Sequence, residues 1–440
     1  MKKSIFILLL FCSFTGLFGQ KTAYEYDSLT LHYYYMGNWD SLIIVGNEAI
    51  KNEVDFFYLR SRMGFASFSK AHYRNAIKHF EKAYQLNSYD DFVKYYLYLS
   101  YKNAGMTSEV NYFGEKLSEE AKTELNYELP FVSHFYMETG LGLPDSKLKQ
   151  IPKKERFLVA KSSNKSMLYG TFGFNHQLGK NISLFHTFSN YQMKDLDVYG
   201  NQYQTNEIDI KVNITQYYFA PSFRIFKRTS FLPFVHFSSI KTQFSQPLPI
   251  FSGPGQDPMF QFRTTDTSII DFSFGGNVFR NTNFGGLSLG LSLNRFGGLG
   301  TFQQNVGLLW YPLKTNKFYF KTDIQHLMSK DSAAKSRMNF EQILGFAITK
   351  NIWSELFWVH GNITGGNMSN GYLLYNGLHR QKEMYGIKLS YFSTKVNFFV
   401  RAQYAQYESD YLKYELGQIV YYNTSNFNKI NIIGGLLWKL

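Results

Sequence analysis

The strongest constraint on the fold is a period of two in the apolar residues of the last three hundred or so positions. In the stretch FGGLSLGLSLNRF (284–296), leucines alternate with Ser, Gly and Asn. Similar alternation recurs at 208–215, 270–275, 385–391 and 396–403. Because successive side chains of a strand point to opposite faces, each segment has one apolar face and one polar face. We therefore expect β-structure whose apolar face lies either on a protein core or on lipid.

The lengths of the connections favour lipid. Short connections lie at 178–181, 227–230, 281–283, 314–317, 349–351 and 393–395. Between them lie longer connections around 193–206, 244–266, 328–338, 361–383 and 408–427, with one shorter exception near 297–301. Short turns at one end and long loops at the other are typical of an outer-membrane barrel. Segments of ~10–14 residues suffice to cross such a membrane at a tilt.

The predicted barrel covers 126–440. Thirteen alternating segments can be counted, and an even number requires a fourteenth, which we place at 131–143; twelve or sixteen strands are the open alternatives. At the C-terminus, five apolar residues share one face: Ile430, Ile432, Leu436, Trp438 and Leu440. Gly435, Trp438 and Leu440 resemble the terminal recognition signal of bacterial outer-membrane proteins. The expected partners are therefore outer-membrane lipids and the barrel-assembly machinery.

The N-terminus carries an export signal. Residues 1–19 contain two lysines, an apolar run from Ile5 to Phe11, and Gly19 at the expected cleavage site. Cys12 is the only cysteine, so the mature chain has none, which excludes disulfides, iron–sulfur clusters and thiol catalysis. No later run reaches the ~18 apolar residues of a transmembrane helix. An exported chain with 19% aromatic residues then favours a membrane barrel.

Residues 23–125 repeat with a period of 34. The middle unit, 57–90, has the small and large residues of a tetratricopeptide (TPR) repeat at Gly64, Tyr73, Ala76, Phe80, Ala83 and Leu86. A shift of one period brings Gly37, Trp39, Leu42 and Ala49, or Gly105, Thr107, Val110 and Leu117, to related positions. The segment resembles the TPR family, with Ser88 in place of the usual proline; an ordinary helical bundle is the alternative. The expected fold is a short α-solenoid followed by an antiparallel transmembrane β-barrel of about fourteen strands.

The resemblance implies a concave surface lined by the first helix of each pair. The repeat frame places eight aromatic residues near it: Tyr24, Tyr34, Tyr35, Tyr58, Phe65, Phe68, Phe92 and Tyr95. They would bind a periplasmic protein or polysaccharide, or would pack on neighbouring helices. The module is nearly neutral, so nucleic acid is not an expected partner.

The polar faces of the strands carry charges of both signs. We assign eight to the lumen: Asp209, Lys211, Asp271, Lys321, Asp323, Glu341, Lys388 and Arg401. Equal signs predict cross-strand pairs that stiffen the wall or close a narrow pore. The proline-rich loop at 244–260 would fold inward as a constriction or remain a rigid surface loop.

Motifs for chemistry are absent from the sequence. The histidines have no metal-ligand spacing, and no nucleophile elbow, P-loop or dinucleotide fingerprint occurs. We expect no enzyme activity, no metal and no cofactor.

The domain order resembles that of the TPR-containing export porins of exopolysaccharide secretion and of the YaiO-type outer-membrane proteins. The resemblance implies a passive conduit or an assembly component for envelope polysaccharide or protein export, with the TPR module in the periplasm. One alternative is a plugged structural or adhesion barrel that anchors periplasmic partners. The other is a barrel enzyme that acts on lipids.

Overall fold

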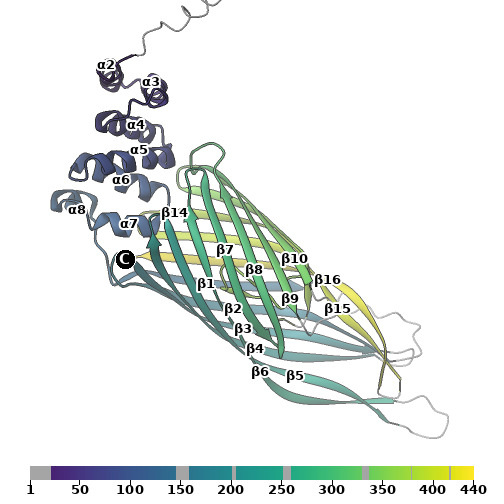
Figure 1. The fold of residues 1–440 in the computed structure, drawn as a ribbon. Coiled ribbons are helices and arrows are strands. Elements are labelled where there is room, and N and C mark those ends of the chain that lie inside the picture. The colour runs from purple at the N-terminus through teal and green to yellow at the C-terminus, as the bar shows by residue number, and fades with distance from the viewer. Residues whose placement is uncertain are drawn as a thin grey trace, which may run out of the picture. The chain divides into compact units, whose positions relative to one another are not determined.

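The computed structural model describes residues 21–144, 158–200, 205–250, 259–329, 336–377, 379–415 and 418–440. The chain divides into two compact units between Tyr127 and Glu128 (Figure 1). The predicted export signal, 1–19, lies outside the described residues.

The first unit consists of seven described helices. They are α2 (Ala23–Tyr35), α3 (Trp39–Lys51), α4 (Phe57–Ser69), α5 (Tyr73–Leu86), α6 (Asp91–Asn103), α7 (Thr107–Gly114) and α8 (Glu119–Leu125). Helices α2, α4 and α6 begin 34 residues apart, and so do α3, α5 and α7. This spacing is the period read from the sequence, while the assignment to the TPR family stays a prediction. None of the described helices is long and apolar enough to cross a bilayer.

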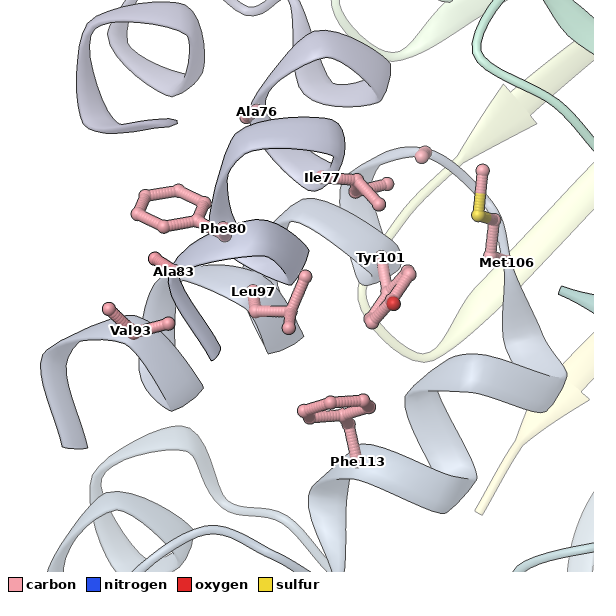
Figure 2. Packing of buried hydrophobic residues seen from close by; sticks show 10 residues of the cluster. Ala76, Ile77, Phe80, Ala83, Val93, Leu97, Tyr101, Met106 and Phe113 are labelled. Carbon is pink, nitrogen blue, oxygen red and sulfur yellow. The ribbon is translucent and has the colours of Figure 1, made fainter. Parts of the chain in front are cut away.

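Two neighbouring clusters of apolar side chains form the core of the helical unit. In the larger one, Phe80, Ile77 and Leu97 are fully buried between α5 and α6 (Figure 2). Gly64 on α4 lies against the ring of Phe80, where an added Cβ would stand only 2.7 Å from ring carbons. The small residue of the repeat is therefore what lets α4 and α5 approach closely.

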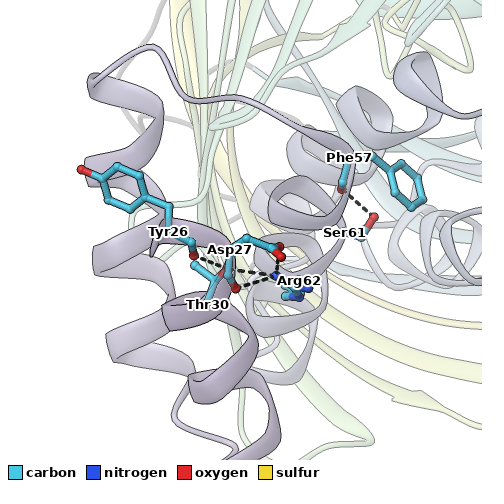
Figure 3. A network of polar contacts seen from close by, with 6 residues as sticks. All are labelled: Tyr26, Asp27, Thr30, Phe57, Ser61 and Arg62. Carbon is cyan, nitrogen blue, oxygen red and sulfur yellow. Dashed lines mark hydrogen bonds and ion pairs between the residues drawn. The ribbon is translucent and has the colours of Figure 1, made fainter. Parts of the chain in front are cut away.

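A polar contact joins the first repeat to the second. The Arg62 side chain on α4 donates to the carboxylate of Asp27 at 2.7 Å, to the Asp27 carbonyl at 3.1 Å and to the Thr30 hydroxyl at 3.1 Å (Figure 3). Thr30 is fully buried on α2. One guanidinium thus fixes α2 against α4 by hydrogen bonds as well as by charge.

The second unit is a closed antiparallel barrel of fourteen strands, so the predicted fold class is confirmed. The strands are β1 (Val132–Pro144), β2 (Leu158–Gln177), β3 (Ile182–Gly200), β4 (Thr205–Phe226), β5 (Thr229–Ile250), β6 (Met259–Asn281), β7 (Gly285–Phe296), β8 (Leu299–Trp310), β9 (Phe318–Ser329), β10 (Ser336–Ala347), β11 (Ile352–His360), β14 (Arg380–Phe392), β15 (Val396–Glu415) and β16 (Gln418–Lys439). Each pairs with the next in this order, and β1 pairs with β16 to close the cylinder. β1 supplies the fourteenth strand.

The outer face carries an apolar band. On β7, Leu287, Leu289, Leu291 and Leu293 point outward and are exposed, while Ser292 and Asn294 are buried inside. Other strands show the same polarity, for example β14, whose Ile387 and Leu389 are exposed. A cylinder with an apolar outside is the surface that a bilayer requires, so the leucine-rich face lies on lipid and the barrel is of the membrane-spanning kind.

The predicted strand length is wrong for half of the barrel. Strands β2 to β6, β15 and β16 have 19 to 23 residues, because most residues assigned to long loops near 193–206, 244–266 and 408–427 continue the hairpins. The short turns do lie together, at the end where the chain enters β1 and where β16 finishes. The long strands extend the cylinder at the other end.

In this extension the apolar side chains lie on the inner face of the barrel and the charged ones on the outer face. On β4, Ile210, Val212 and Ile214 are buried inside, and the intervening Asp209 and Lys211 are exposed outside. The placement of Asp209 and Lys211 in the lumen was therefore wrong. Beyond the bilayer the outer face meets water, so the apolar side chains turn inward and form a core.

Candidate functional site in the barrel lumen

A segment between β11 and β14 occupies the lumen. This inward segment, 361–379, is described except for residue 378. It contains a small hairpin of β12 (Asn367–Met368) and β13 (Leu373–Leu374). Its turn has positive φ at Ser369 (52°), Asn370 (61°) and Gly371 (86°). Gly371 lies against the Phe234 ring of the opposite wall, where an added Cβ would stand 2.1 Å away, so glycine is required there.

Asn367 is the central anchor of the inward segment, and it is 1% exposed. Its amide nitrogen lies 2.8 Å from Ser292 Oγ, 2.8 Å from Asn294 Oδ1 and 3.2 Å from Ser273 Oγ. Its backbone pairs with the side chain of Gln303, which accepts from the Asn367 N–H at 2.8 Å and donates to the carbonyl at 2.7 Å. One residue is thus bonded to β6, β7 and β8.

Further hydrogen bonds reach the opposite wall. The Tyr218 hydroxyl on β4 donates to the Asn370 carbonyl at 3.0 Å, and His236 Nδ1 on β5 donates to the Gly371 carbonyl at 2.8 Å. On β8, the Thr301 hydroxyl donates to the Gly365 carbonyl at 2.6 Å. The inward segment therefore spans the lumen from β11 and β14 to β4, β5 and β8.

Apolar contacts also hold the inward segment in place. Ile363 and Met368 of the inward segment are buried against Phe357 and Val359 of β11 and Met384 of β14. This cluster is a true hydrophobic core inside the barrel. The inward segment is held by packing on the strands from which it arises and by polar bonds on the strands across the lumen.

A cavity of about 310 Å³ remains beside the inward segment. Much of its wall is apolar or aromatic, with Val212, Ile214, Ile240, Tyr191 and Tyr407 among the lining residues. The charged side chains that reach it are Glu138, Asp195, Asp271, Arg401 and Lys429. The lumen therefore contains an amphipathic space beside the inward segment.

The six other predicted lumen charges lie on the inner side of the wall. Lys321 forms ion pairs with Asp323 and, at 3.4 Å, with Glu341. Lys388 pairs with Glu355 at 3.1 Å, a partner that the sequence reading missed.

The remaining two inner charges depart from the expected cross-strand ion pairs. Asp271 accepts hydrogen bonds from Asn376 at 2.8 Å and from the Gly297 N–H at 2.7 Å. The Arg401 guanidinium lies 4.2 Å from the centre of the Phe357 ring and forms no ion pair within the described chain. Its predicted cross-strand pairing is therefore wrong.

The eight aromatic residues predicted on the helical surface fall into three groups. Tyr34, Phe65, Phe68 and Phe92 contact other aromatic rings; for example, the centres of the Tyr34 and Phe65 rings are 5.4 Å apart. Tyr24, Tyr35 and Tyr58 are largely exposed. Tyr95 donates to Glu124 at 2.8 Å, and this bond raises the Tyr95 pKa to about 12. Packing thus accounts for the first group, and a binding role for the exposed tyrosines stays a prediction.

The proline-rich loop, 244–260, was left open as an inward constriction or a rigid surface loop. Its described parts, 244–250 and 259–260, continue β5 and β6, and the intervening 251–258 lies outside the described residues. At 361–383, which contains the inward segment, the sequence predicts only a long connection. The signal of the inward segment was the Asn370–Gly371 pair between apolar residues, which favours a tight hairpin rather than an open loop.

Of the predicted C-terminal signal, Gly435 lies against Phe399, and Trp438 and Leu440 are exposed on the outside. Gly435 faces a ring carbon that would stand 2.1 Å from an added Cβ. Recognition of these residues by the assembly machinery stays a prediction.

No protein-family model matches the chain, and no curated protein matches it. Among solved structures, it is similar to a FadL homologue from Pseudomonas aeruginosa, with 8% identity, a TM-score of 0.45 and coverage of 70% of this chain and 90% of that one. The toluene transporter TodX of P. putida gives 7% identity, a TM-score of 0.43 and the same coverages. The transport unit of the autotransporter AIDA-I from Escherichia coli gives 11% identity, a TM-score of 0.33, and coverage of 70% of this chain and 90% of that one. At these values the likeness concerns the barrel architecture and assigns no cargo.

Proposed function

We propose that this protein is a gated passive conduit of the bacterial outer membrane, with its helical module in the periplasm. The observation that carries the proposal is the inward segment, which crosses the lumen to bond with β4, β5 and β8 and leaves a cavity beside it. The apolar outer band, the export signal and the C-terminal pattern support the location. The proposal assigns no catalysis and no cofactor.

The bonds across the lumen suit a gate. Among the described residues, most of the hydrogen bonds that hold the inward segment to β4, β5 and β8 join neutral groups. Examples are the bonds of Thr301 with Gly365 and of Tyr218 with Asn370. A neutral hydrogen bond contributes only about 0.5–1.5 kcal/mol net, because water replaces the lost partner. Entry of water could therefore release the far side of the segment while its packing on β11 and β14 keeps it attached.

The cavity favours a small cargo in the closed state. Its 310 Å³ is about twice the ~150 Å³ of an engineered apolar cavity that binds benzene. Export of an envelope polysaccharide or a protein, which the domain order suggests, would require the inward segment to leave the lumen completely. In either case the helical module, with Tyr24, Tyr35 and Tyr58 exposed, would recruit a periplasmic protein or polysaccharide.

The second candidate is a plugged structural barrel that anchors periplasmic partners. The observation in its favour is the hydrophobic core that Ile363 and Met368 form with the wall, since such a core resists opening. The two candidates differ in whether the inward segment moves.

A reversible cross-link tests this difference. Thr301 Cγ2 lies 3.5 Å from the position of a Cβ on Gly365, so T301C with G365C places two thiols within reach of a disulfide. Because Gly365 has φ 80°, a side chain there strains the backbone, and G365A is the control for this strain. In planar bilayers we expect wild type to show intermittent single-channel openings. The oxidised double variant should stay closed, and a reductant should restore the openings. T301C alone, with the same oxidant, is the control. Silence of wild type and of the reduced double variant would favour the plugged barrel.

A further inference from the structure

A buried lysine lines the cavity, and among the described residues it has no carboxylate at ion-pair distance. Lys429 on β16 is 6% exposed. Within the described part of the chain, its ammonium has one hydrogen-bond contact, the thioether of Met167 at 3.6 Å, and no carboxylate within 4 Å. A thioether is a weak acceptor. A buried ammonium without a stronger partner is costly, so an anion missing from the chain itself would complete the site.

The carboxylates of the cavity are held by neutral donors. Asp195 accepts from the Asn164 amide at 2.7 Å. Glu138 accepts from the hydroxyls of Tyr136 and Tyr169. Asp271 is bonded by an amide and a backbone N–H, as described above. None of them forms an ion pair with a cavity cation in the described structure.

Arg401 is a second cation of the cavity that forms no ion pair within the described residues. It rests on the Phe357 ring, and its Nε is buried without a hydrogen-bond partner in the described structure. The cavity thus combines three bonded carboxylates with two cations, and neither cation forms an ion pair within the described residues. An acidic group that reached Lys429 would give its ammonium the close partner that it lacks.

Unsatisfied polar atoms also line the cavity. Asn431 Oδ1, His379 Nε2 and Gln381 Nε2 are buried without partners, and all three residues line the cavity. His379 contacts Phe427, two residues before Lys429, with ring centres 5.0 Å apart. These nitrogens can donate to an acidic group that also reaches the ammonium.

Aromatic side chains line the rest of the cavity in stacked pairs. Tyr407 and Phe427 lie 5.2 Å apart at 13°, and Tyr169 and Tyr191 lie 4.9 Å apart at 11°. Such faces accept a flat apolar group by offset or edge contacts.

We propose that the cavity binds a small organic acid with one anionic group and an aromatic body, its acid on Lys429 and its ring among these aromatic side chains. The inference rests on the proposed function, since it names the class of molecule that the conduit would hold. Gly142 on β1 supports the arrangement: an added Cβ would stand 2.3 Å from the Lys429 stem, so the glycine leaves room for the lysine.

The test compares three ligands of the same shape. Binding of 3-phenylpropionate, 3-phenylpropanol and 3-phenylpropylamine to the full chain in lipid nanodiscs would be measured by calorimetry. We expect wild type to prefer the acid to the alcohol by at least tenfold and to bind the amine weakly. Lys429→Met and Lys429→Gln should abolish the preference and keep the affinity for the alcohol. Lys211→Gln, which alters a lysine on the outer face, should leave the preference unchanged.

Equal affinity of wild type for the acid and the alcohol would overturn the inference, and this result needs no variant to fold. A preference that survives both Lys429 substitutions in folded barrels would do the same. Acid-selective binding to a barrel that never conducts would keep the inference and remove the conduit. Conductance without acid selectivity would remove only the inference.

Discussion

Asn367 is the position at which the proposed gate can be loosened with the least change to the protein. Substitution by alanine removes an amide that lies within hydrogen-bond distance of Ser292, Asn294 and Ser273. An amide nitrogen has two protons, so about two bonds are lost at once. The Gln303 contacts use the Asn367 backbone and remain.

The expected change in the free-energy difference between the closed and open states follows from these contacts. Two neutral bonds contribute about 1–3 kcal/mol net, and the buried acceptors that lose a donor add to the cost. We expect the closed state to lose about 2–3 kcal/mol relative to the open state. Since 1.4 kcal/mol is a factor of ten, the ratio of open to closed channels should rise roughly 25- to 150-fold.

Single-channel recording in planar bilayers measures this ratio directly. The matched control is Asn362→Ala, an identical substitution in the same segment. Among the described residues, the Asn362 side-chain oxygen accepts one local bond, from the Thr364 N–H at 3.3 Å. This variant should change the ratio by less than threefold. If the two variants open equally often, the bonds of Asn367 do not hold the gate and the reasoning fails.

Two further predictions concern the helical unit. Burial, and then the charge of Arg60, lower the pKa of His79 from 6.5 to about 3. Between these two pH values the unfolded chain binds more protons than the folded chain. The free energy of unfolding therefore falls as the pH drops from 6.5 towards 3. Between pH 7 and 5 the unit should lose about 2 kcal/mol, seen as a shift in urea unfolding followed by helical circular dichroism, and His79→Gln should flatten this dependence. Arg62→Ala should weaken the attachment of α2 by about 1–3 kcal/mol, since Asp27 and buried Thr30 lose their donor. Faster exchange of the backbone amide hydrogens, confined to residues 23–35, would support this prediction. Unchanged exchange in that range would count against it.

Much of the barrel could be predicted because its rules are local. Alternation of Leu287 to Leu293 sets the lipid-facing side, and short turns set the end at which the chain enters. Alternation alone cannot say which face is inside, because the same pattern fits lipid outside or a core inside. Asp209 and Lys211 were misplaced for this reason: they lie near the start of β4, in the part of the strand that extends beyond the bilayer.

The inward segment depended on contacts that sequence distance hides. Asn370 and Gly371 indicated a tight turn, yet their partners Tyr218 and His236 lie more than a hundred positions earlier in the chain. Lys429 carried no local signal, since its unusual state arises only when β16 closes against β1 and β15.

The inward segment also has a mechanical consequence. It acts as a brace fixed to the wall at β11 and β14 and, across the bore, at β4 to β8, so the cylinder cannot be flattened along that line without breaking the bonds of the brace. Release of the brace would make the wall more compliant to lateral pressure. The thickness and tension of the surrounding membrane then become part of what sets the open state.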